Sequence, residues 1–168
     1  MIKDKISLNV RDIMLMSMML VLLEVSKYAL SFIAGVEVVS LLIIIYTLYL
    51  GKKMVYVLPA FYLIEGMLYG FGIWWFMYLY IWVILAFITY VFKENKSIYF
   101  WSIISGVFGL AFGLLCCPIY FIIGGSEMAI SWWITGIQTD IIHGLSNFII
   151  CMVLFEPLNR VISMLDKK

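Results

Sequence analysis

This sequence contains six apolar stretches, and nearly all of its lysine and arginine residues lie at alternate junctions along them. Six apolar stretches leave seven polar ends, and the connections near 33–37, 70–74 and 120–130 contain no Lys or Arg. The basic residues lie before the first stretch and after the second, fourth and sixth: Lys3, Lys5, Arg11, Lys52, Lys53, Lys93, Lys96, Arg160, Lys167 and Lys168. Because Lys and Arg concentrate in cytoplasmic loops, this alternation predicts six membrane spans with both termini in the cytoplasm.

The composition favours the same class of protein. Of the 168 residues, 65% are hydrophobic and 12% are charged, and the mean hydropathy is +1.11. These values lie far from those of soluble domains. Since a bilayer core of roughly 30 Å takes about 20 helical residues per crossing, six crossings use most of the chain. We expect one all-α integral membrane domain over residues 1–168, with spans near 12–33, 36–50, 54–71, 74–92, 98–122 and 130–156.

Glycine and proline residues mark the predicted connections on the outer side. Gly70 and Gly72 indicate a tight turn between the third and fourth spans. Pro118 and the pair Gly124-Gly125 are expected to end the fifth span, and the loop over 118–130 is expected to close over the protein. The second span is short, so we expect it to tilt little or to begin before residue 36.

The sixth span carries a stripe of polar side chains. Asp140, His143 and Asn147 are three and four residues apart, so they share one face of a helix. Ionisable groups in the hydrocarbon core cost about 2.5–3.5 kcal/mol each on insertion scales and usually face a cavity or one another. The stripe therefore indicates either a ligand site in the outer half of the membrane or a polar network that joins helices.

Three further ionisable residues lie inside predicted spans. Glu65 lies in the third span, at a similar depth to Asp140, as either a ligand-binding or a structural residue. Glu24 and Lys27 are one helical turn apart in the first span, which predicts an ion pair between them. Lys27 is also the one cation of the outer half. Two intramembrane carboxylates, Glu65 and Asp140, favour a ligand with hydrogen-bond donors or partial positive charge, such as a nitrogen heterocycle.

Aromatic residues make up 17% of the chain and crowd the outer side. An aromatic belt at the membrane interface explains part of this cluster. Stacking surfaces beside polar groups are also what a planar heterocyclic ligand needs. The candidates for this role are Tyr69, Trp74, Trp132 and Trp133.

The fifth span contains small residues at every fourth position. Ser105, Gly109, Gly113 and Cys117 lie on one stripe, and such stripes let helix backbones approach closely. The stripe predicts tight packing inside the protein; a groove for another membrane subunit is the alternative.

The last 40 residues resemble a known family. The segment 131–148, SWWITGIQTDIIHGLSNF, and the later Phe155-Glu156-Pro157-Leu158 look like the final helix of the S components of energy-coupling factor (ECF) transporters. S components are small, six-helix, vitamin-binding subunits of bacterial uptake systems. The length of the chain and its six predicted spans agree with this resemblance.

The resemblance implies a function, a location and partners. An S component binds a vitamin or related micronutrient at the outer face of the bacterial plasma membrane. It then docks on a membrane scaffold subunit driven by two ATPases and hydrolyses nothing itself. The final helix supplies a polar ligand contact, which implies Asn147, and outer aromatics supply stacking, which implies Trp132, Trp133 and Trp74. The Ala-x-x-x-Ala docking pair of many relatives is absent from the first span, where only Ser17 is small.

Two other functions stay open. S components share their fold loosely with MreD-like cell-shape proteins, which allows a scaffolding membrane protein without a small ligand. An intramembrane enzyme is the third reading, with His143 and Asp140 as its only candidate pair. We expect no cofactor and no nucleic acid. We also expect no metal site, because His143 is the one histidine and catalytic zinc takes about three protein ligands.

Overall fold

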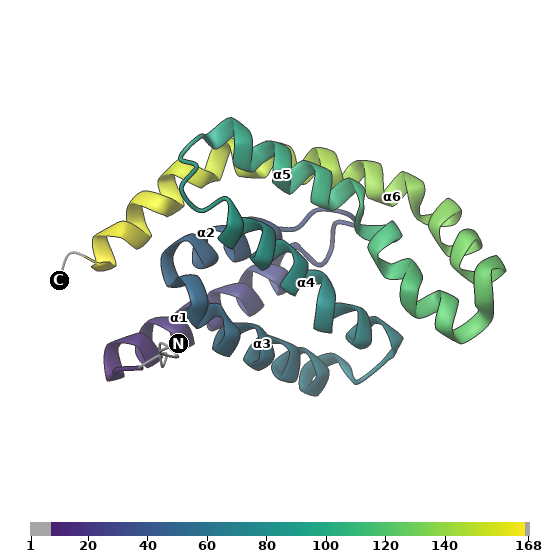
Figure 1. Ribbon diagram of the computed structural model, residues 1–168, viewed down its shortest axis with the longest axis horizontal. Coiled ribbons are helices and arrows are strands. Elements are labelled where there is room, and N and C mark those ends of the chain that lie inside the picture. Colours follow the sequence, from purple (N-terminus) through teal and green to yellow (C-terminus); the bar gives the residue numbers. More distant parts are fainter. Residues whose placement is uncertain (1–7, 167–168) are drawn as a thin grey trace, which may run out of the picture.

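The computed structural model describes residues 8–166, so Lys3, Lys5, Lys167 and Lys168 of the basic pattern lie outside the described residues. The described chain is helical between its turns and contains no strand. Its elements, in order, are α1 (Val10–Leu30), α2 (Val39–Leu50), the short 3-10 helix η1 (Gly51–Lys53), α3 (Met54–Tyr69), α4 (Ile73–Val91), α5 (Ile98–Leu110) and α6 (Phe112–Asp166) (Figure 1).

Four helical stretches are long and apolar enough to cross a membrane, which gives the chain the character of a membrane protein. They are Val10–Leu30, Val39–Tyr69, Ile73–Val91 and Ile98–Met164. Two of the four are interrupted. The second stretch turns at η1 between α2 and α3. In the fourth, Gly124 and Gly125 leave the helical conformation, with φ of 73° at Gly125. We call residues 112–123 the first arm of α6 and residues 126–166 its second arm.

The structure corrects two expectations about the outer connections. The predicted loop over 118–130 is helical on both sides of Gly124-Gly125, and Pro118 lies inside the first arm. A proline removes only one helical hydrogen bond, and glycine at positive φ reverses the chain within two residues, so no longer loop is needed. The predicted fifth span is also interrupted, since α5 ends at Leu110 and the first arm begins at Phe112.

The second predicted span does not begin before residue 36. Helix α2 starts at Val39, and the Ser40 backbone N–H donates to Glu37 Oε2 at 2.8 Å. Because the first N–H groups of a helix have no partner within the helix, the Glu37 side chain ends the loop and caps α2. The turn predicted at Gly70 and Gly72 is present: α3 ends at Tyr69, Gly70 has φ of 87°, and α4 starts at Ile73.

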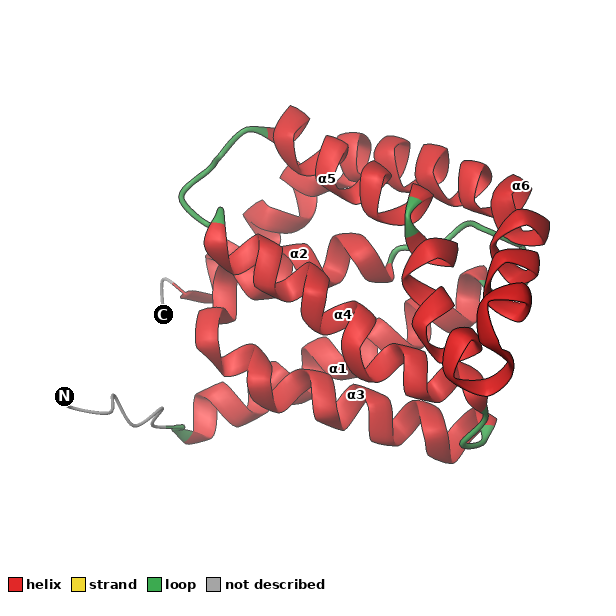
Figure 2. Cartoon of the chain, turned by 45° about the vertical axis from the view of Figure 1, so that its right-hand side comes forward, coloured by secondary structure: helices red, strands yellow, loops and turns green. Residues whose placement is uncertain are grey.

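The helices stack in three layers (Figure 2). α5 and α6 form one layer, α1 and α3 form the opposite one, and α2 lies with α4 between them. α2 contacts every other helix. This position explains why a 12-residue helix of almost entirely apolar sequence is buried on all sides. A helix that is hydrophobic all round belongs in such a core.

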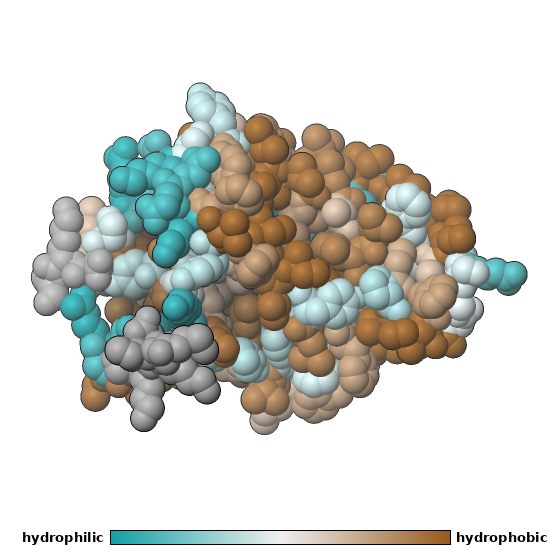
Figure 3. Space-filling view, viewed as in Figure 1, coloured by the Kyte–Doolittle hydropathy of each residue, from teal (hydrophilic) through white to brown (hydrophobic). Residues whose placement is uncertain are grey.

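The connections alternate between the two ends of the bundle. η1 and the α4–α5 connection lie at the end where α1 begins and α6 finishes, whereas the α1–α2, α3–α4 and Gly124-Gly125 turns lie at the other (Figures 1 and 2). Hydrophilic residues gather at the first of these ends, and apolar side chains cover most of the remaining visible face (Figure 3). The basic turns predicted to share one side therefore share one end of the molecule.

Small residues bring α5 and the second arm of α6 into backbone contact, as the stripe predicts. A Cβ atom on Gly109 would lie 2.8 Å from the His143 carbonyl oxygen and 2.9 Å from Gly144 Cα. One on Gly144 would lie 2.9 Å from the Gly106 carbonyl oxygen. Atoms at such distances overlap, so no side chain larger than hydrogen fits here. This packing fixes the position of Asp140, His143 and Asn147 relative to α5.

The glycine contact gives a first prediction. Gly109→Ala is expected to destabilise the protein by about 1–3 kcal/mol, because overpacking against backbone atoms forces α5 and α6 apart. Gly136→Ala is the matched control, since a Cβ there meets nothing within 4 Å and alanine favours the helix by up to about 1 kcal/mol. Thermal unfolding of the two purified variants measures the difference. Equal midpoints would contradict the packing.

Candidate functional site

The structure contains a cavity of about 490 Å³. Its walls come from α1, the α1–α2 loop, the start of α2, α4 and both arms of α6. The charged and aromatic lining residues are Lys27, Glu37, Tyr78, Trp82, Phe112, Trp132, Asp140 and His143. Three of these, Asp140, His143 and Trp132, are among the residues that the sequence predicts for a ligand site.

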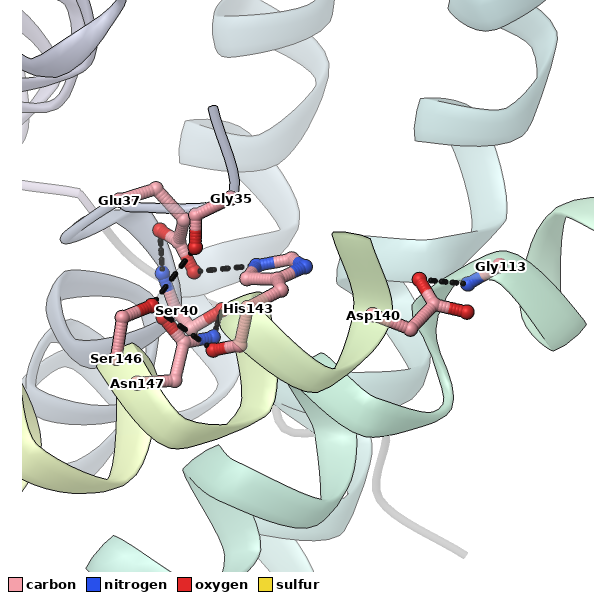
Figure 4. A network of polar contacts seen from close by, with 8 residues as sticks. All are labelled: Gly35, Glu37, Ser40, Gly113, Asp140, His143, Ser146 and Asn147. Carbon is pink, nitrogen blue, oxygen red and sulfur yellow. Dashed lines mark hydrogen bonds and ion pairs between the residues drawn. The ribbon is translucent and has the colours of Figure 1, made fainter. Parts of the chain in front are cut away.

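The polar stripe of α6 is buried, and each of its members bonds to a different element (Figure 4). Asp140 Oδ1 accepts from the Gly113 backbone N–H at 3.1 Å, and His143 Nε2 lies 3.2 Å from Glu37 Oε1. Asn147 Nδ2 donates to the Ser40 hydroxyl at 3.2 Å. The stripe is thus a network that joins helices, and two of its members also face the cavity.

Two carboxylates at the cavity cap helix N-termini. Gly113 is the second residue of the first arm of α6, and its N–H is paired by Asp140 from the second arm. Glu37 does the same for α2 through the Ser40 N–H. Helix N-termini carry partial positive charge and unpaired N–H groups. The two acidic side chains are therefore held in place by backbone groups that need an acceptor.

Glu37 is a cavity residue that the ligand site predicted from the sequence does not include. It lies in the loop before α2, outside the membrane-spanning stretches. Burial raises the pKa of its carboxyl, but bonds from His143 and Ser40 outweigh burial, and the pKa lies below its ordinary value. The carboxylate is charged at neutral pH and places a negative charge at the wall of the cavity. The tight glycine-containing loop brings it there: the Ser146 hydroxyl donates to the Gly35 carbonyl at 2.7 Å.

Two buried polar atoms of lining residues have no hydrogen-bond partner among the described residues. They are Asp140 Oδ2, an acceptor, and Trp82 Nε1, a donor. An unsatisfied buried polar group costs about 1–3 kcal/mol, and native structures contain few of them. Both atoms belong to side chains that line the same cavity.

Glu65, Tyr69 and Trp74 gather around Lys27 and do not line the cavity. The Lys27 ammonium pairs with Glu65 Oε2. It lies 5.0 Å from the ring centroids of Tyr69 and Tyr78 and 5.6 Å from that of Trp74. The expected pair of Glu24 with Lys27 is therefore wrong. Glu65 is fully buried, and a buried carboxylate needs a counter-charge.

The two neighbouring tryptophans of the second arm differ in position. Trp132 lines the cavity and stacks on Tyr120 of the first arm, with ring centroids 4.1 Å apart and planes at 24°. Trp133 is 39% exposed and does not line the cavity. Successive residues on a helix point about 100° apart, so only one of the two can face inward.

The ligand site predicted from the sequence does not include three aromatic residues that line the cavity, Tyr78, Trp82 and Phe112. Trp82 and Phe112 pack in one aromatic cluster, with ring centroids 5.8 Å apart, and Phe112 also meets the His143 ring at 5.0 Å. Tyr78 and Trp82 are four residues apart on α4 and so share a face. The four-residue spacing of Tyr78 and Trp82 could have indicated that they share a face of α4. However, α4 contains so many aromatic residues that spacing alone does not separate those that line the cavity from those on the outer surface.

Within residues 8–166, no group of three or more His, Cys, Asp or Glu side chains is close enough to hold a metal ion. No protein-family model, curated protein or solved structure matches the chain. A function is therefore inferred from the cavity, from the residues that line it and from the sequence.

The Glu37 contacts predict a pH dependence of stability. A carboxyl whose folded pKa lies below its ordinary value of 4.5 stabilises the fold fully above that pH, and this contribution is lost as the pH falls further. Glu37→Gln should therefore be less stable than the wild type at pH 7, with the difference shrinking below about pH 4.5. Thermal unfolding in detergent across this range measures it. Glu127→Gln, an exposed change on α6, is the control; an equal effect there would contradict the role of Glu37.

Proposed function

We propose that this protein is a solute-binding subunit of the bacterial plasma membrane, of the ECF S-component type. It binds one vitamin or related micronutrient in the cavity beneath Trp132, from the outer face. The observation that carries the proposal is the cavity itself: about 490 Å³, within the range of roughly 300–1,000 Å³ for small-molecule sites. Its lining combines apolar and aromatic side chains with six polar ones, which are Lys27, Glu37, Thr135, Thr139, Asp140 and His143. The resemblance of residues 131–148 to the final S-component helix supports the same function.

The proposed topology has six membrane spans with both termini in the cytoplasm. α1, α2, α3 and α4 each form one span. α5 with the first arm of α6 forms the fifth, and the second arm forms the sixth. The alternation of basic and non-basic ends supports this topology, because η1 and the α4–α5 connection carry lysines and the opposite turns carry none. The cavity then opens toward the outer half of the membrane.

The lining indicates the chemistry of the ligand. Asp140 contributes a carboxyl group and Trp82 an indole N–H to the lining residues, so the proposed ligand carries both donors and acceptors. Phe112, Trp132 and Trp82 offer aromatic surface, which suits a planar ring. Glu37 and Asp140 favour donors or partial positive charge on that ring. We propose a planar nitrogen heterocycle as the ligand.

Release of the ligand inward requires partners. We propose a membrane scaffold subunit and two ATPases, which supply the energy, while this chain hydrolyses no ATP. The exposed methionines of α1, Met14 and Met18, lie on the surface that lacks the docking alanines of many S components. Methionine side chains adapt to different surfaces, which supports α1 as a docking face.

Cysteine labelling tests the topology. Glu127→Cys, beside the Gly124-Gly125 turn, should react with a membrane-impermeant maleimide in intact cells, whereas Lys93→Cys should react only after the membrane is opened. The native cysteines Cys116, Cys117 and Cys151 are replaced by alanine beforehand. Labelling of Lys93→Cys in intact cells, or of both sites alike, would overturn the proposed orientation.

Ligand binding is tested on matched tryptophan variants. The small molecule that copurifies with the full chain is first identified by native mass spectrometry and then titrated. Trp132→Ala should weaken its binding by roughly 2- to 10-fold, from a lost stacking energy of about 0.5–1.5 kcal/mol. Asp140→Ala should weaken it as well. Trp133→Ala, at almost equal exposure but off the cavity, should bind like the wild type.

Two outcomes oppose the proposed function. Equal weakening by Trp132→Ala and Trp133→Ala would place the site elsewhere. A chain that carries no small molecule and shows no thermal shift across a panel of vitamins would favour a scaffolding role instead.

A further inference from the structure

The cluster around Lys27 contains more negative charge than positive charge. Its carboxyl groups belong to Glu24 of α1 and Glu65 of α3, and its one ammonium belongs to Lys27. Both carboxyl groups lie in membrane-spanning stretches. With both ionised, the cluster has a net charge of −1 in apolar surroundings. An uncompensated charge in such surroundings is strongly unfavourable.

Three carboxylate oxygens of this cluster have no hydrogen-bond partner among the described residues. They are both oxygens of Glu24 and Oε1 of Glu65, and all three are inaccessible to solvent. Glu65 is fully buried. Glu24 lies one helical turn before Lys27 on α1, and Lys27 bonds to Glu65 of α3, which packs against α1, so the two carboxyl groups belong to the surroundings of one ammonium. Two ionised carboxylates cannot bond, because each only accepts; they bond only when one of them carries a proton.

No other described cation is placed to neutralise the pair. The Lys27 ammonium bonds to Glu65 Oε2 and is surrounded by the rings of Tyr69, Trp74 and Tyr78. The tyrosine hydroxyls facing the cluster add no positive charge. α2, which packs against α1 and α3, contains no charged residue. Glu37 of the α1–α2 loop bonds to His143 and Ser40 and would only add negative charge.

We propose that Glu24 and Glu65 form a proton-binding site, in which one proton is shared between the two carboxyl groups within the membrane. The Glu24 hydroxyl donates to Glu65 Oε1, while Glu65 Oε2 stays paired with Lys27. The three groups then sum to zero charge, and the unpaired Glu65 oxygen gains a donor. The proton belongs to the pair, as in other closely coupled carboxyl dyads. This inference does not depend on the proposed function.

The site is adjacent to the cavity through one side chain. Lys27 lines the cavity wall and bonds to Glu65 at the same time. Loss of the proton leaves two carboxylates to compete for one ammonium, so the position of Lys27 depends on the protonation of the pair. A proton bound at this site therefore changes the charge presented to the cavity.

Infrared spectroscopy of the full chain in lipid nanodiscs at neutral pH tests the proposal. A protonated carboxylic acid shows a carbonyl stretch separate from the carboxylate and amide bands, and this stretch shifts in heavy water. We expect such a band in the wild type and its loss in both Glu24→Gln and Glu65→Gln. In Glu24→Gln the amide N–H replaces the proposed O–H donor, so this variant should fold, and its amide I band verifies that it does. If it does not fold, Glu65→Gln alone decides the assignment.

Asp12→Asn is the matched control, since Asp12 is a carboxylate of the same helix that pairs with Lys53 at 2.7 Å. It should keep the band unchanged. A wild-type spectrum without a protonated carboxyl band would overturn the proposal. So would a band that survives in both glutamine variants, because it would belong to another group. A carboxylate band that responds to sodium in place of potassium, with no protonated band, would show a metal cation site instead.

Discussion

The unpaired N–H groups at the start of two helices determine where this cavity lies and what lines it. The first arm of α6 is capped by Asp140 and α2 by Glu37. Backbone groups inside an apolar medium must find partners within the protein. Each carboxylate therefore fixes the end of one helix against another segment of the chain. His143 links the two systems, because it lies one turn from Asp140 and bonds to Glu37.

The packing of α5 against α6 supports these bonds. Gly106, Gly109 and Gly144 allow the two backbones to touch, so the second arm of α6 has little freedom to slide or rotate. Its polar face is consequently directed at the α1–α2 loop and α2, while Gly144 and its neighbours pack against α5. A cavity formed this way keeps its shape without a ligand, which lowers the entropy cost of binding.

Residue spacing predicted the features that depend on a single helix. It did not predict which charged side chains of two different helices pair with each other. The offsets of Asp140, His143 and Asn147 require a common face in any helix, and all three are buried together. The small-residue stripe likewise requires close packing. Lys27 has an acidic residue one turn away, yet it pairs with Glu65, which is 38 positions distant. Sequence spacing does not show which carboxylate of a neighbouring helix the Lys27 ammonium reaches, and that contact depends on how α1 packs against α3.

The resemblance and the structure assign different roles to Asn147. The S-component resemblance implies that it contacts the ligand. In the structure its amide donates to Ser40 and it does not line the cavity. The Ser40 backbone N–H also donates to Glu37, so Asn147 and Glu37 both bond to the same residue at the start of α2. Asn147 therefore helps to position the loop that contains Glu37, and under the proposed function it acts on the ligand through that loop.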